Sequence, residues 1–233
     1  RREILDFLGG HRRVAFVTAA SLHDESAYFA RVQSLLGGQQ PGGAGLELLH
    51  LRWNDRPLDT LGRAEALFMG GGNTYALLKR LRETGLLPAI RARVEAGMPY
   101  VGASAGSNVA GPTILSTNDW NVVALDRFDA LGLVSFNINP HYKETDPAMA
   151  PGSETRDDRI REYHVVNANP VVGLEEEMDD PVGELRELPQ LHSDGHGRRR
   201  QVGDRGEGAL RRIGVEGAEH GDVGMPEARV GRH

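Results

Sequence analysis

The stretch YVGASAGSNVA, Tyr100–Ala110, joins a short apolar run to small residues that read as the start of a helix. Within it the pattern G-x-S-x-G places Ser104 between Gly102 and Gly106, where a strand ends and a helix begins. Glycines at these two positions leave room for a sharp turn that exposes the serine hydroxyl. Ser104 is therefore either a nucleophile presented by that turn or only the N-cap of the helix that begins at Ala105.

The sequence on both sides of this turn alternates between strand-like and helix-like patterns. Short apolar runs predict buried strands over residues 13–20, 46–52, 65–72 and 99–104. Helices are predicted over 21–36 with Ser21 as N-cap, over 73–85 with Asn73 as N-cap, and over 86–97. Such alternation predicts an α/β fold, with a mostly parallel sheet and helices on both faces. Ligands then bind at the carboxyl ends of the strands, where GGGN and GASAG both lie.

The composition excludes several classes of protein. Because the 233 residues contain no cysteine, disulfides, thiolate catalysis and sulfur-ligated metals are excluded. No apolar run approaches the ~20 residues of a membrane span, and the opening RREILDFLGG is too charged for a signal peptide. A net charge of −6 argues against nucleic acid as a partner. We expect a cytoplasmic protein without a membrane partner.

The character of the chain changes near residue 178. Every aromatic residue lies at or before Tyr163, and the last 55 residues are rich in glycine and arginine. That segment has neither strand alternation nor a sustained helical stripe, and it lacks the large side chains that build a core. We predict one folded domain over residues 1–178 and a segment, 179–233, whose structure the sequence specifies poorly.

Three further stretches contain candidate site residues. GGGN, residues 70–73, fits a flexible turn, a phosphate cradle or, in an acyl-transfer enzyme, the source of a second oxyanion N–H. His141 follows Pro140 at the end of the alternating run LVSFNIN, where a strand-end loop would hold a general base. Asp119, in STNDWN, is either a turn residue or a buried partner for a histidine.

The remaining histidines carry less information. We expect structural roles for His11, His23 and His50, which lie in surface-like or strand contexts. His192 and His196 have the i, i+4 spacing of a metal pair on a helix. Their segment HSDGH contains a glycine and no helical pattern, so no metal site is expected there.

Four segments in this order resemble the peptidase E family: FMGGGNTYALLKRLRETGLL, YVGASAGSNVAGPTILSTND, FDALGLVSFNINPH and GSETRDDRIREYHVVN. These α-aspartyl dipeptidases belong to a serine peptidase family that also contains the cyanophycinases. The resemblance covers residues 66 to 174 and implies a flavodoxin-like or class I glutamine-amidotransferase-like fold with the nucleophile at a strand-to-helix turn. It implies no cofactor.

The resemblance also implies a role for each matching residue. Ser104 would be the nucleophile, His141 the general base and then the general acid, and Asp119 the carboxylate that orients the imidazole. Glu176, in VVGLEEE, is the alternative third member of the triad.

Substrate contacts follow from the same resemblance. The backbone N–H groups of Gly72 and Ala105 would stabilise the oxyanion, and Arg156, in E-T-R, would bind the aspartyl side chain of the substrate.

The implied function is a serine-type dipeptidase that hydrolyses Asp-X dipeptides through an acyl-enzyme. Two alternatives stay open: a cyanophycinase-like hydrolase of β-aspartyl-arginine peptides, and a non-catalytic remnant of the same fold that binds a small molecule. The resemblance implies an apolar strand before the position of Arg1, which we expect the chain to lack, and the residues after Glu176 depart from the family pattern.

Overall fold

The computed structural model describes residues 2–37, 45–142, 154–175 and 190–191. Its centre is a parallel sheet in the order β2-β1-β3-β4. These strands are β1 (Arg13–Val17), β2 (Glu47–Leu51), β3 (Ala66–Met69) and β4 (Tyr100–Gly102). A second sheet contains β5 (Asn137–Asn139), β6 (Val171–Glu175) and β7 (Gln190–Leu191), with β5 parallel and β7 antiparallel to β6. The predicted mostly parallel sheet is confirmed.

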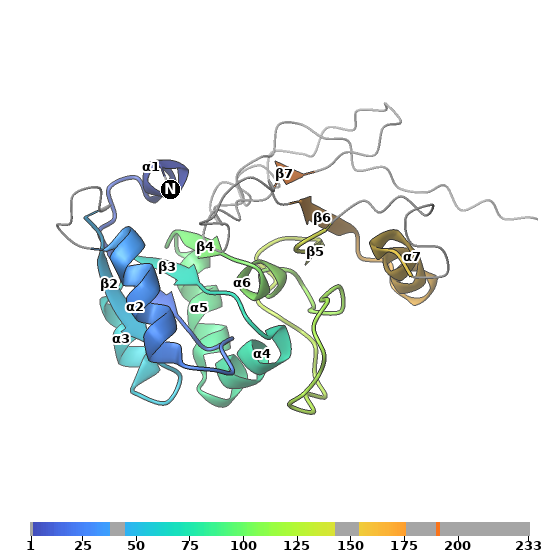
Figure 1. The fold of residues 1–233 in the computed structure, drawn as a ribbon, viewed down its shortest axis with the longest axis horizontal. Helices are drawn as coiled ribbons and strands as arrows, with labels where there is room; N and C mark the ends of the chain where they lie inside the picture. Colours follow the sequence, from blue (N-terminus) through green and yellow to red (C-terminus); the bar gives the residue numbers. More distant parts are fainter. Residues whose placement is uncertain (1, 38–44, 143–153, 176–189, 192–233) are drawn as a thin grey trace, which may run out of the picture.

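The helices of the described residues are α1 (Arg2–Leu8), α2 (Glu25–Leu36), α3 (Pro57–Arg63), α4 (Thr74–Glu83), α5 (Leu86–Glu95), α6 (Ala105–Asn108) and α7 (Arg156–Val166). Helices lie on both sides of the central sheet, as predicted: α1 and α2 on one face, and α4 and α5 on the other (Figure 1). The second sheet and α7 lie at the end of the molecule opposite β2 (Figure 1). The Asn73 side chain caps α4, as predicted, by accepting from the N–H of Ala76 at 2.9 Å.

The core is divided into two layers by the alternation of side chains along each strand. In β1, Ala15 and Val17 pack with α4 and α5, whereas Val14 and Phe16 pack with α1 and α2. All four side chains are buried. The sheet is therefore covered on both faces, and its exposed chemistry is confined to the loops at the strand ends.

The start of α2 corrects one prediction. Ser21 is not the N-cap; Asp24 is, and its carboxylate accepts from the N–H groups of Ser26 and Ala27 at 2.9 and 3.0 Å. The N–H of Ser21 instead donates to the Thr18 carbonyl at 2.9 Å, which closes a turn directly after β1. That turn delays the helix, and an aspartate can cap as well as a serine.

Several predictions concern residues that the structure does not describe. The boundary at residue 178, Glu176 and the pair His192 and His196 lie outside the described residues. Among the residues that are described, no helix is long and apolar enough to cross a membrane.

Candidate active site

Ser104 occupies a backbone conformation that few non-glycine residues adopt. Its φ is +51° and its ψ is −110°, at the junction of β4 and α6. Such a conformation costs about 1–3 kcal/mol and persists only where its surroundings enforce it. Here the Tyr100 hydroxyl donates to the Gly106 carbonyl at 2.6 Å, and the Ser107 hydroxyl donates to the Gly102 carbonyl at 2.7 Å. The predicted sharp strand-to-helix turn is present.

The two glycines of G-x-S-x-G allow α6 to approach the sheet closely. A Cβ added at Gly106 would lie 2.2 Å from the carbonyl oxygen of Met69 in β3. A Cβ added at Gly102 would lie 2.7 Å from the carbonyl oxygen of Gly106. The Ser104 side chain makes no capping hydrogen bond to α6, so its hydroxyl does not act as an N-cap.

His141 faces this hydroxyl. Its Nε2 lies 2.7 Å from Ser104 Oγ, although 37 residues separate them in the chain. His141 follows β5 and has a φ of +57°, so a second strained residue lies at the same site. Burial lowers the pKa of His141 below its ordinary value of 6.5; the charge of Asp119 raises this pKa, and that of Arg156 lowers it. The imidazole is therefore neutral near pH 7 and able to accept a proton.

Asp119 is anchored at the start of α4 and is not a simple turn residue. Its Oδ2 accepts the backbone N–H of Thr74 at 2.7 Å and the Thr117 hydroxyl at 3.3 Å. Its neighbour Asn118 is hydrogen-bonded to the carbonyl group of Pro140, the residue before His141, and the charge of Asp119 raises the pKa of His141. The structure thus brings Ser104, His141 and Asp119 to one place.

Two asparagines, which the sequence reasoning missed, hold the Asp119 and His141 loops together. Asn118 donates from Nδ2 to the Pro140 carbonyl at 2.8 Å. Asn139 donates from Nδ2 to the Ser116 carbonyl at 2.6 Å and to Asn118 Oδ1 at 2.9 Å. Asn118 directly precedes Asp119 in T-N-D, and Asn139 lies two residues before His141 in N-P-H; this proximity in the chain was the available signal.

The glycine loop after β3 lies against the Ser104 turn. A Cβ at Gly71 would lie 3.1 Å from the Cβ of Ser104, so this loop borders the hydroxyl directly. The N–H of Gly71 donates to the Tyr28 hydroxyl at 3.1 Å. Gly72 has a φ of +134°, and its own N–H stays the predicted oxyanion donor of this loop. The other predicted donor, Ala105, is the buried first residue of α6, whose N–H has no partner within the helix.

Arg156, the predicted ligand of the aspartyl side chain, is the first residue of α7. Its Nη1 donates to Asn118 Oδ1. Among the described residues no carboxylate forms an ion pair with Arg156; Glu154 pairs with Arg159 at 3.4 Å, and Asp157 pairs with Arg161 at 3.7 Å.

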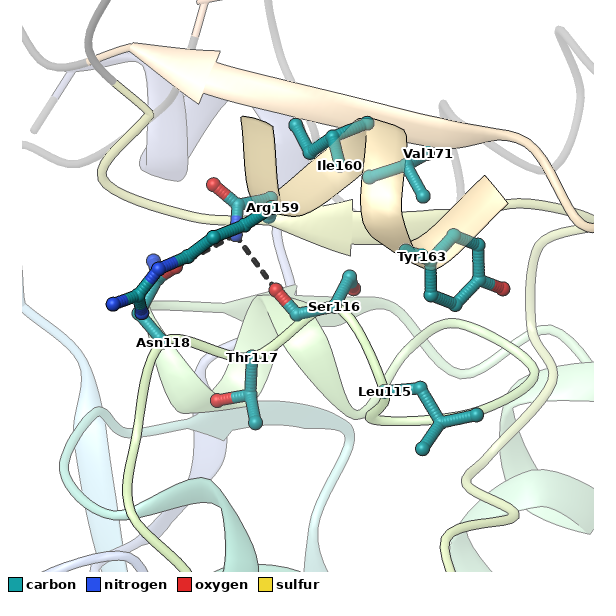
Figure 2. A pocket seen from close by; sticks show the side chains of 9 residues that line it. Leu115, Ser116, Thr117, Asn118, Arg159, Ile160, Tyr163 and Val171 are labelled. Atoms are coloured by element: carbon teal, nitrogen blue, oxygen red, sulfur yellow. Dashed lines mark hydrogen bonds between the residues drawn. The ribbon is translucent and has the colours of Figure 1, made fainter. Parts of the chain in front are cut away.

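A pocket lies between α7 and the loop that leads to Asp119, with an empty volume of about 290 Å³, part of it open to solvent. Figure 2 shows Arg159 extending along this pocket toward Asn118. Its described lining residues are Leu115, Ser116, Thr117, Asn118, Asn139, Arg159, Ile160, Tyr163 and Val171. Burial lowers the pKa of Arg156, and the positive charge of Arg159 lowers it further.

The other histidine predictions have different outcomes. His50 has structural contacts: its Nε2 lies 3.0 Å from the Thr18 hydroxyl, and its ring stacks on Phe29 with centroids 4.2 Å apart. His11 and His23 are exposed. Within the described ranges no three histidines, aspartates or glutamates are grouped so that they could hold a metal ion.

Comparisons with known proteins show which family this chain belongs to. Residues 1–179 match the profile of Peptidase family S51. A Streptomyces coelicolor protein named Peptidase E is 43% identical over 173 residues, which cover 74% of this chain and 69% of that protein. A Drosophila melanogaster protein named "Probable alpha-aspartyl dipeptidase" is 45% identical over 166 residues, 71% of this chain and 67% of that protein.

A solved structure extends the likeness to the fold. A Listeria monocytogenes protein assigned provisionally to Peptidase E is 27% identical and superposes with a TM-score of 0.53. The superposition covers 68% of this chain and 79% of that chain. The chain described here belongs to Peptidase family S51 and is a serine peptidase.

Proposed function

We propose that this peptidase hydrolyses dipeptides whose first residue is aspartate, through an acyl-enzyme formed on Ser104. The 2.7 Å contact between Ser104 Oγ and His141 Nε2, at a strained strand-to-helix turn, is the observation that carries the proposal. The names of the Streptomyces and Drosophila relatives support the aspartyl specificity.

The reaction follows from these contacts. Neutral His141 accepts the proton of Ser104 as Oγ attacks the peptide carbonyl carbon, and it returns this proton to the leaving amine. Asp119 stabilises the imidazolium that forms between these steps. The N–H groups of Gly72 and Ala105 stabilise the oxyanion. A water molecule then attacks the aspartyl ester; His141 accepts a proton from this water and returns it to Ser104 Oγ as aspartate leaves.

Arg156 is our candidate for recognition of the substrate's aspartyl side chain. Its partial burial near His141, its neutral partner Asn118 and the adjacent charge of Arg159 leave positive charge at the edge of the site. A carboxylate entering a partly dehydrated cleft needs such a partner, and a guanidinium can bind it with two parallel hydrogen bonds.

Replacing Arg156 by alanine is expected to lower kcat/KM for Asp-Leu by about 100-fold or more, the scale of one lost charged pair. Hydrolysis of Asn-Leu should change little, because its amide does not need the cation. Arg161→Ala is the matched control: Arg161 lies on the same helix, is exposed and pairs with Asp158 at 2.7 Å. Equal losses on both substrates would show that Arg156 supports the fold and that another residue recognises aspartate.

The pH dependence of kcat/KM should reflect the neutral state of His141. Because burial lowers the pKa of His141, activity should fall with acid only below the ordinary pKa of 6.5. Arg156→Ala removes a positive neighbour and should move this acidic limb to higher pH. Asp119→Asn removes a negative neighbour and should move it to lower pH. Shifts in the same direction, measured as kcat/KM against pH, would exclude His141 as the titrating base.

A substrate panel separates the proposed activity from its alternatives. Asp-Leu should be cleaved, and Leu-Leu should not. Preferential cleavage of a β-aspartyl-arginine peptide would instead indicate the cyanophycinase-like activity, and inertness toward all three would indicate a non-catalytic binding protein.

We also propose that the reaction takes place in the cytoplasm, as the resemblance implies, and cell fractionation with an antibody to the chain tests this location.

A further inference from the structure

The position of the predicted oxyanion donor depends on the loop between β1 and α2. Ala20, in this loop, accepts the N–H of Asn73 through its carbonyl oxygen at 2.9 Å. A Cβ added at Gly72 would lie 2.5 Å from the same oxygen. Gly72 therefore rests directly on the Ala20 carbonyl, and a movement of that carbonyl would move the glycine.

Arg80, in α4, binds the carbonyl groups on either side of Ala20. Its Nη1 donates two hydrogen bonds, to the carbonyl oxygens of Ala19 and Ser21, each at 2.7 Å. Three successive carbonyl groups of the loop are thus fixed, two by Arg80 and the one between them by the Asn73 N–H. Because each peptide unit is planar, holding the outer two carbonyls also limits rotation of the middle one.

The guanidinium of Arg80 is itself held in place. Glu25 Oε1 lies 3.5 Å from Nη1, and the guanidinium carbon lies 5.0 Å from the centre of the Trp53 ring. Glu25 also accepts from the Trp53 indole N–H at 3.0 Å and from the Thr18 hydroxyl at 2.9 Å. The side chains of Arg80 and Glu25 are 19% and 14% exposed, so this ion pair is largely shielded from water.

We propose that Arg80 is a positioning residue for catalysis, which holds the Ala20 carbonyl against Gly72 and so aims the Gly72 N–H at the oxyanion. The inference rests on the proposed function, because the oxyanion forms only if Ser104 is acylated. Arg80 contacts neither Ser104 nor His141 in the described structure; it acts through the loop. It also lies on the helix whose first N–H anchors Asp119, so one helix aligns two parts of the site.

The test replaces Arg80 by methionine, which keeps an apolar stem over Trp53 and removes both hydrogen bonds. We expect kcat for Asp-Leu to fall by about 10- to 100-fold. Complete removal of one oxyanion donor lowers kcat by about 10²- to 10³-fold, and a displaced donor loses much of this contribution. KM and the affinity for the product aspartate should change little, because neither the substrate complex nor the product complex contains the oxyanion. The affinity for the boronic acid analogue of aspartate, whose tetrahedral adduct occupies the oxyanion site, should fall in parallel with kcat.

Arg93→Met is the matched control. Arg93 also joins backbone carbonyls, with hydrogen bonds to Leu61 and Ala64 at 3.1 and 2.6 Å. These carbonyl groups lie before the first residue of β3, whereas Ser104 follows the last residue of the parallel strand β4. A purely structural loss should lower the thermal midpoint of both variants, whereas only Arg80→Met should lose kcat and affinity for the boronate.

The outcomes separate the inference from the proposed function. Equal kcat in Arg80→Met and Arg93→Met, or parallel losses of kcat and aspartate affinity in Arg80→Met, would overturn the positioning role. If Arg80→Met does not fold, Arg80→Lys, which keeps the charge opposite Glu25, is compared with Arg93→Lys by the same criteria. Unchanged hydrolysis in Ser104→Ala, measured alongside, would overturn the proposed function and the inference with it.

Discussion

Ser104→Ala is expected to abolish hydrolysis of Asp-Leu while the protein stays folded. The change removes one oxygen at a turn that is held by other groups, namely the Tyr100 and Ser107 hydroxyls and the close packing of Gly106 on β3. Losses on removing a triad nucleophile reach about 10⁴–10⁶ in kcat, because attack on the carbonyl has no substitute. Steady-state kinetics, with circular dichroism to check the fold, measure the effect.

Ser107→Ala provides the control for this variant. Ser107 is buried and its hydroxyl donates to the Gly102 carbonyl, so its loss should reduce stability and leave most activity. If Ser104→Ala keeps more than about a thousandth of the wild-type kcat, the nucleophile lies elsewhere.

Asp119→Asn is expected to lower kcat by about 10⁴-fold, the scale found when an orienting aspartate becomes an amide. The Thr74 N–H must still find an acceptor, which fixes the amide oxygen of the new side chain in the place of Oδ2. The amide NH₂ then takes the place of the second carboxylate oxygen, where it can no longer stabilise the imidazolium. Measured kcat, with the thermal midpoint as a check on the α4 anchor, gives the result.

Glu176→Gln is the comparison that assigns the third triad member. We expect it to cost far less activity than Asp119→Asn, because the segment around Asp119 keeps the family pattern, whereas the residues after Glu176 depart from it. The reverse ranking would show that Glu176 orients the imidazole.

The sequence predicted the central part of the fold because its signals there are local. Apolar runs gave the strands β1 to β4, and Asn73 marked the start of α4 correctly. The short helices α1 and α3 were not predicted. Each has seven residues, too few for a sustained apolar stripe, and α3 begins at Pro57 after the left-handed residue Arg56.

The candidate site was predicted residue by residue from short motifs, but its internal contacts were not. The number of residues between Ser104 and His141 does not determine how far apart they lie in space. The fold brings Ser104 Oγ to 2.7 Å from His141 Nε2. The hydrogen bonds from Asn118 to Pro140 and from Arg80 to Ala19 join loops whose relative position depends on the packing of whole elements. Such long-range contacts have no signature in the pattern of a single sequence.

Direct detection of the acyl-enzyme tests the central claim. The protein is mixed with an activated ester of aspartate, quenched in acid within milliseconds and digested, and the peptides are analysed by mass spectrometry. We expect an aspartyl ester on Ser104 that accumulates in the wild-type protein and is absent from Ser104→Ala. An aspartyl adduct on another residue, or turnover of the ester without any covalent adduct on the protein, would contradict the account.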